Sequence, residues 1–105
     1  MAFTGSEGAP IEQNKAAKWT LAHREANPEG LYGHFFGREI LEAILSQDGC
    51  KGIRFHYGLD DGVPQLLAVG ADSAENDQLT DAIIADENAP SPPRIGALNV
   101  LNSTL

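Results

Sequence analysis

The stretch KGIRFHYGLDDGVPQLLAVG, residues 51–70, decides the predicted fold. Apolar and polar residues alternate over 51–59, which is the period of a half-buried β-strand. Residues 63–70 form a second apolar run, and the segment 60–62 between the two runs is typical of a three-residue hairpin loop with Gly62 in the left-handed position. Apolar side chains occupy one face of the first strand: Ile53, Phe55 and Tyr57. The stretch therefore predicts an antiparallel hairpin.

The predicted loop length fixes the register of this hairpin. The register contains three apolar pairs: Leu59 with Val63, Phe55 with Leu67, and Ile53 with Val69. A two-residue loop would slip the register by one and scatter these residues over both faces, so we favour the longer loop. Pro64 has no N–H to donate and marks an edge or an unpaired position.

Two helices are predicted before the hairpin. The segment 11–26 follows Pro10, is rich in good helix formers and ends at the breaker Asn27-Pro28-Glu29-Gly30. Its apolar stripe is weak and has Trp19 as its anchor. The second helix has apolar residues at spacings of three and four, followed by Gly49 at the position of a C-terminal cap: Phe36, Ile40, Leu41, Ile44 and Leu45. It is predicted to be the core helix.

Residues 71–87 fit either a short helix or a third strand. We expect the strand, because a lone two-stranded hairpin is only marginally stable. The segment Asn88–Pro93 favours polyproline geometry, which predicts an extended Pro-rich tail over 88–105. The predicted fold class is α+β, with two N-terminal helices packed on a small antiparallel meander or hairpin. A flexible N-terminus over 1–9 and a single domain over 10–87 complete the organisation.

Composition narrows the classes of partner. The 105 residues carry 15 acidic and 7 basic side chains, a formal charge of −8, which disfavours nucleic acid and anionic membrane surfaces as partners. Cys50 is the only cysteine, so no intrachain disulfide can form. The first residues lack a signal peptide and no long apolar run exists, so we expect a cytoplasmic protein, unless an export signal was removed.

Three polar side chains are candidates for a ligand-binding site. His34, His56 and Asp60 would converge in a pocket between the second helix and the sheet, although each also fits a solvated surface position. Asp72, Asn76 and Asp77 offer oxygen ligands but lack the spacing of a calcium loop. No metal-ligand spacing involves Cys50, and no nucleophile or phosphate-binding motif is present, so we expect no catalytic residue, metal or cofactor.

Several segments resemble one family of uncharacterised bacterial proteins. The segments are 34–45, 49–54, 57–59 and 69–72, and the likeness covers roughly residues 20–90. The family is small and is seen especially in Bacteroidetes. Its members often carry a Cys-Pro-Pro segment and a further cysteine near the end, where this chain has Ser91-Pro92-Pro93. The resemblance implies no activity.

The sequence supports three hypotheses about function. The first is a non-enzymatic interaction module that self-associates, because the predicted sheet has an exposed edge and the tail carries the apolar residues Ile95, Leu98, Val100 and Leu101. The second is a small ligand-binding domain or enzyme that uses the pocket described above. The third is an acidic inhibitor that mimics a polyanion.

Overall fold

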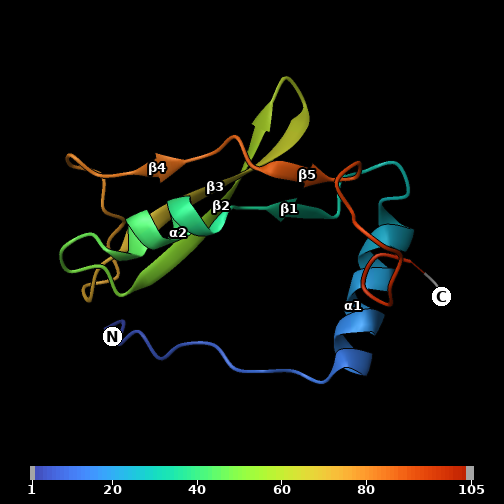
Figure 1. Cartoon of the computed structure of the whole chain (residues 1–105), viewed down its shortest axis with the longest axis horizontal. Coiled ribbons are helices and arrows are strands. Elements are labelled where there is room, and N and C mark those ends of the chain that lie inside the picture. Colours follow the sequence, from blue (N-terminus) through green and yellow to red (C-terminus); the bar gives the residue numbers. More distant parts are fainter. Residues whose placement is uncertain (1, 104–105) are drawn as a thin grey trace. The chain divides into compact units, whose positions relative to one another are not determined.

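The computed structural model describes residues 2–103, and these fall into two compact units. Unit 1 contains the residues up to Gly8 together with Phe36–Asn88, and unit 2 contains Ala9–Phe35 and the chain from Ala89 onward. Met1, Thr104 and Leu105, which belong to the predicted N-terminus and tail, lie outside the described residues. Figure 1 shows the elements of both units.

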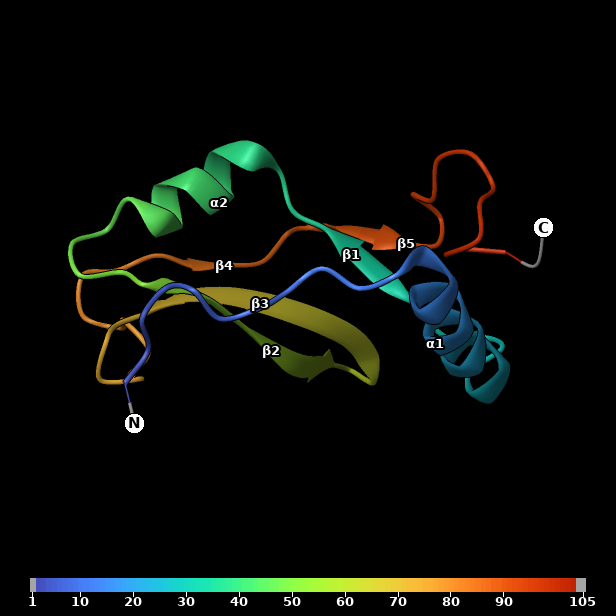
Figure 2. The ribbon, with the colours of Figure 1, turned by 90° about the horizontal axis from the view of Figure 1, so that it is seen from below.

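Unit 1 is built from one helix and a three-stranded antiparallel sheet. The elements are α2 (Arg38–Leu45), β2 (Gly52–Asp60), β3 (Val63–Ala71) and β4 (Ile84–Ala85), with the strands in the order β2-β3-β4. Figure 2 shows α2 on one side of the three strands. The predicted apolar stripe of α2 supplies Ile44, which is fully buried against Ala68 and Ala85. Gly49 is not the C-terminal cap that we predicted: α2 is capped at Ser46, and Gly49, with φ +76°, lies in the following turn, where the Cys50 amide donates to the Gln47 carbonyl.

The predicted hairpin exists, but its predicted register is wrong. The loop has two residues, Asp61 and Gly62, and Asp60 pairs with Val63. Both loop residues have positive φ, +49° and +80°, the geometry whose twist matches that of the flanking strands. The register therefore places small residues of β3 opposite large ones of β2: Ala68 opposite Phe55 and Gly70 opposite Ile53.

The physical reason for this register is the space that α2 needs. Ala68 is fully buried beneath the helix, and the Phe36 ring lies 5.6 Å from the Phe55 ring. A large side chain at position 68 would hold α2 away from the sheet. Pro64 lies opposite Leu59, outside the short segment of β3 that pairs with β4, so its missing N–H costs no ladder hydrogen bond.

The third strand is confirmed but is short. β4 pairs Ile84 with Val69 and Ala85 with Ala68. Residues 71–87 contain no helix, and the segment around Leu79 that precedes the strand is irregular. The strand is limited to the two residues that cover Ala68 and Val69.

Unit 2 contains α1 (Gln13–Ala26) and a two-stranded antiparallel sheet of β1 (Gly33–Phe35) and β5 (Ala89–Ser91). The helix ends at Ala26 and is capped by Asn27, whose side-chain amide donates to the His23 carbonyl. Trp19 is exposed and does not anchor the helix; its ring contacts the Lys15 amine instead. The Arg24 guanidinium donates to the carbonyls of Leu101 and Ser103, which ties the apolar end of the chain to α1.

The α+β class is thus confirmed, with two helices and antiparallel sheets of two and three strands. Packing of the first helix on the sheet, an extended tail over 88–105 and a single domain over 10–87 stay predictions. Among residues 2–103, no helix is long and apolar enough to cross a membrane.

Candidate functional site

The face of the sheet opposite α2 carries a charged cluster made by Arg54, His56 and Asp77. Arg54 and His56 are alternate residues of β2 and so share this face, while Asp77 lies in the loop after β3. Arg54 Nη1 lies 2.5 Å from Asp77 Oδ1, and His56 Nε2 lies 2.8 Å from Asp77 Oδ2. Each carboxylate oxygen therefore has its own basic partner. Both basic side chains, Arg54 and His56, therefore hold the loop to the strand.

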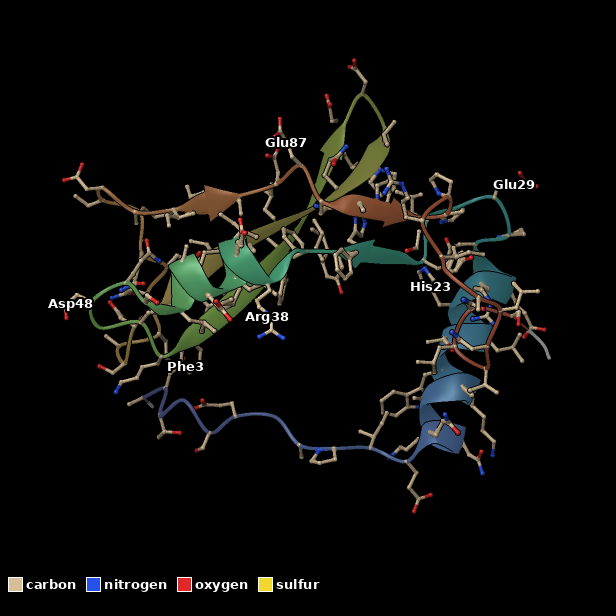
Figure 3. All side chains as sticks on the ribbon, viewed as in Figure 1. Phe3, His23, Glu29, Arg38, Asp48 and Glu87 are labelled. Atoms are coloured by element: carbon tan, nitrogen blue, oxygen red, sulfur yellow. The ribbon has the colours of Figure 1, made fainter. Side chains whose placement is uncertain are left out.

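Two further contacts complete the cluster. The Arg54 guanidinium donates to the Glu75 carbonyl at 3.1 Å and lies 5.2 Å from the centre of the Phe3 ring. The Phe3 amide donates to the Ser73 carbonyl at 3.0 Å. The N-terminal segment is therefore fixed to the loop and to the guanidinium at the same place. Figure 3 labels Phe3 on this segment.

The Asp77 carboxylate is bound by both basic side chains of the cluster, His56 and Arg54. Its side chain is 21% exposed, and burial by itself raises the pKa of Asp77. The hydrogen bonds from His56 and Arg54 outweigh burial and hold the pKa of Asp77 below its ordinary value. The carboxylate is thus ionised at neutral pH, and the cluster acts as a clamp rather than as a proton donor.

A cleft of about 300 Å³ lies between the N-terminal segment and the start of β2. Its walls include three residues of each: Phe3, Gly5 and Glu7 from the segment, and Lys51, Gly52 and Arg54 from the strand end. The Glu7 carboxylate accepts hydrogen bonds from the Thr4 and Gly5 amides, and these bonds lower the pKa of Glu7. Lys51 supplies a positive charge at this cleft, whereas the Arg54 guanidinium is already paired with Asp77.

The sequence-predicted site residues occupy different places. His34 lies on β1 of unit 2, whereas His56 and Asp60 lie on β2 of unit 1. The partner of His56 is Asp77 rather than Asp60, and neither His56 nor Asp60 lines the cleft. A pocket formed by these three side chains stays a prediction.

Sequence reasoning missed the role of Asp77 and of Phe3. The strand alternation already placed Arg54 and His56 on one face, and the acidic segment after the hairpin could have suggested a partner for them. The carboxylate of Asp72, considered for a calcium loop, accepts hydrogen bonds from the Ala74 and Asn76 amides. Within residues 2–103, no group of three His, Cys, Asp or Glu residues is arranged to hold a metal ion.

The outer strand β2 exposes apolar side chains on the face that α2 only partly covers. Tyr57 is 94% exposed and Leu59 is 76% exposed, and Phe55 is nearly half exposed. They project from one face of the strand, beyond the end of the core that Ile53 and Phe55 share with α2. An apolar row on an outermost strand is the kind of surface that proteins use to bind one another.

No protein-family model matches the chain, and no curated protein or solved structure matches it. Its resemblance to the bacterial family over roughly residues 20–90 stays a prediction.

Proposed function

We propose that this chain is a protein-interaction module that associates with a second copy of itself through the outer edge of β2. The observation that carries the proposal is a nine-residue outermost strand whose apolar side chains Tyr57 and Leu59 are largely exposed. The proposal commits to a non-enzymatic role, since the charged cluster of unit 1 binds its own loop.

The direction of the backbone groups of β2 supports an accessible edge. The carbonyls of Leu66 and Gly70 on β3 accept hydrogen bonds from Asn88 and Gln78, so the even-numbered residues of β3 face away from β2. The odd-numbered residues of β3 then face β2, where the register pairs them with even-numbered residues such as Arg54 and His56. The odd-numbered residues of β2 therefore direct N–H and C=O groups outward.

The usual protections of an edge strand are weak on β2. Natural edges are commonly protected by lysine, by proline or by inward-pointing charge. Within β2 the only basic side chains, Arg54 and His56, bind Asp77, and the outward-facing residues are Ile53, Phe55, Tyr57 and Leu59. Pairing this edge with another strand would satisfy the backbone groups and cover the apolar row.

Covering the exposed apolar side chains Tyr57 and Leu59 contributes favourable free energy to association. Covering a large apolar side chain fully contributes about 1.5–3 kcal/mol, so two such side chains from each copy contribute about 6–12 kcal/mol, the same order as the entropic cost of association. Nucleic acid is a poorer fit as a partner, because the net charge of −8 repels it. A basic protein is also a poorer fit, because the exposed apolar side chains of β2 carry no charge.

Sedimentation velocity over a wide concentration range tests the proposal. We expect a reversible dimer for the unmodified chain and a monomer for Tyr57→Lys, which places a charge on the edge. The matched control is Leu79→Lys, which changes an exposed apolar residue of a loop in the same unit and leaves the dimer intact.

A chain that stays monomeric at all concentrations contradicts the proposal. Native mass spectrometry then separates the other hypotheses, because a monomer that retains a small molecule supports a ligand-binding domain. A monomer that binds basic proteins only at low salt supports a polyanion mimic.

A further inference from the structure

We infer that two copies pair their β2 strands antiparallel with His56 facing His56 of the second copy, and that the cleft beside Lys51 receives the acidic hairpin tip of that copy. The tip consists of Asp60 and Asp61. This inference rests on the proposed self-association and adds its register and its charge contact.

Backbone geometry restricts the registers that are possible. Only the odd-numbered residues of β2 direct hydrogen-bonding groups outward, as argued above from the carbonyls of Leu66 and Gly70. Two copies can therefore form a ladder only if odd-numbered residues pair with odd-numbered residues. Registers that pair odd-numbered with even-numbered residues are excluded, and those centred on Phe55, His56 or Tyr57 remain.

The register centred on His56 uses the whole strand, because His56 is the middle residue of Gly52–Asp60. It places Phe55 opposite Tyr57 and Ile53 opposite Leu59 of the second copy. Every outward-facing residue then has an apolar residue opposite it, and two aromatic cross-strand pairs form across the twofold axis. The sequence of β2 is thus complementary to itself about its centre.

The two neighbouring registers, centred on Phe55 and on Tyr57, pair the strands less favourably. A register centred on Phe55 pairs Leu59 with Lys51, but Gly5 already lies against the Lys51 carbonyl: a Cβ built on Gly5 would be 3.2 Å from that oxygen. A register centred on Tyr57 leaves Ile53 opposite Asp61 of the turn.

Charge supports the same register and identifies a second copy as the occupant. With His56 on the axis, Asp60 lies opposite Gly52 of the other copy, and Asp61 lies beside its Lys51. Lys51 supplies the positive charge of the cleft at that position, since Arg54 is paired with Asp77, and the Glu7 carboxylate in the wall is bound to the Thr4 and Gly5 amides. Twofold symmetry repeats this contact at the other end of the interface.

Disulfide cross-linking tests the register. The variant His56→Cys, made in a Cys50→Ala background, places two thiols on the twofold axis at a non-hydrogen-bonded pair, where Cβ atoms are about 4.5–5.5 Å apart, close enough for a disulfide after small adjustment. We expect covalent dimer to form within minutes under mild oxidation. Gly58→Cys in the same background is the matched control, because Gly58 lies opposite Arg54 and not opposite itself.

Charge reversal tests the contact with the cleft. We expect Asp60→Lys to raise the dissociation constant of the dimer about fivefold, since two exposed ion pairs are lost. Adding Lys51→Glu to the same chain reverses both partners and restores the affinity. Asp86→Lys is the control, because it changes the net charge equally at an exposed position away from the edge.

The outcomes separate the inference from the proposal on which it rests. If the unmodified chain does not associate, both fail. If it associates but the His56→Cys variant does not cross-link, while the Tyr57→Cys variant does, the register is wrong and the self-association stands. If Asp60→Lys and Asp86→Lys have equal effects, the cleft does not receive the tip. The thermal stability of every variant is measured by circular dichroism, so that a misfolded chain is recognised.

Discussion

His56 and Arg54, two residues apart on β2, bind opposite oxygens of the same Asp77 carboxylate, at 2.8 Å and 2.5 Å. One loop carboxylate therefore joins two side chains of the strand. Because Arg54 also binds the Glu75 carbonyl and contacts the Phe3 ring, the sheet, the loop after β3 and the N-terminal segment meet at this carboxylate.

Replacing this carboxylate is expected to destabilise unit 1. Asp77→Asn keeps the size of the side chain and removes both charge-assisted bonds, which should cost about 1–2 kcal/mol of the free energy of unfolding. Urea unfolding measures the change. Asp81→Asn is the control, since Asp81 is an exposed loop residue with φ +49°, a conformation that asparagine tolerates. Equal stability of the two variants would show that the cluster contributes nothing.

The same carboxylate gives the stability a defined dependence on pH. Burial raises the pKa of Asp77, but the bonds from His56 and Arg54 lower it more, so its pKa in the folded chain is below the ordinary value of 3.8. A depressed pKa contributes stability that is fully present above the unfolded value and is lost as the pH falls through the folded value. We expect the stability difference between the unmodified chain and Asp77→Asn to be fully present near about pH 5, where the Asp77 carboxylate is ionised. It should shrink below about pH 3.8. A difference that grows on acidification would contradict this assignment.

Gly70 is expected to tolerate no side chain. A Cβ at this position would lie 2.6 Å from Gln78 Oε1 and 3.0 Å from Cys50 Sγ. These groups are not free to move, because Gln78 donates to the Asp48 carbonyl and Cys50 donates to the Gly52 carbonyl. Gly70→Ala should therefore lower the free energy of unfolding by about 1–3 kcal/mol, measured by urea unfolding.

Gly58→Ala is the matched control for this substitution. Its Cβ would meet only the Cβ of Gln65, at an ordinary 3.9 Å. It should leave stability unchanged or raise it slightly, because alanine restricts the unfolded chain. A Gly70→Ala variant as stable as Gly58→Ala would show that the side chains of Gln78, Cys50 and Gln47 can move aside.

The elements of unit 1 could be predicted because short-range patterns encode them. The spacing of Ile40 and Ile44 indicated α2, and the alternation about Phe55 indicated β2. The register could not be predicted, because it depends on α2 approaching the sheet over Ala68 and Gly70, a three-dimensional requirement that cross-strand pairing of apolar residues does not express. A preference for pairing large residues with large ones led to the wrong loop length.

The candidate site was less predictable than the fold for a related reason. Alternation places Arg54 and His56 on one face, but their partner Asp77 lies 21 residues after His56, beyond the hairpin and in a loop without periodicity. The cleft depends on Phe3 and Gly5, in a segment that we expected to be flexible and that contacts Ser73 and Lys51. Long-range contacts of irregular segments leave no repeating pattern in a sequence.

The salt dependence of self-association follows from the charge of the chain. Two copies that each carry a formal charge of −8 repel one another, and the apolar row that they bury is uncharged. At 0.1 M salt the screening length is about 10 Å, so added salt removes long-range repulsion while leaving apolar burial intact. We expect the dissociation constant of the dimer, measured by sedimentation, to fall several-fold between about 0.02 and 0.3 M sodium chloride. The contacts of Asp60 with the cleft weaken over the same range but are fewer than the repelling charges. A dissociation constant that rises with salt would mean that the attraction of Asp60 to the cleft of the second copy outweighs the repulsion between the two chains.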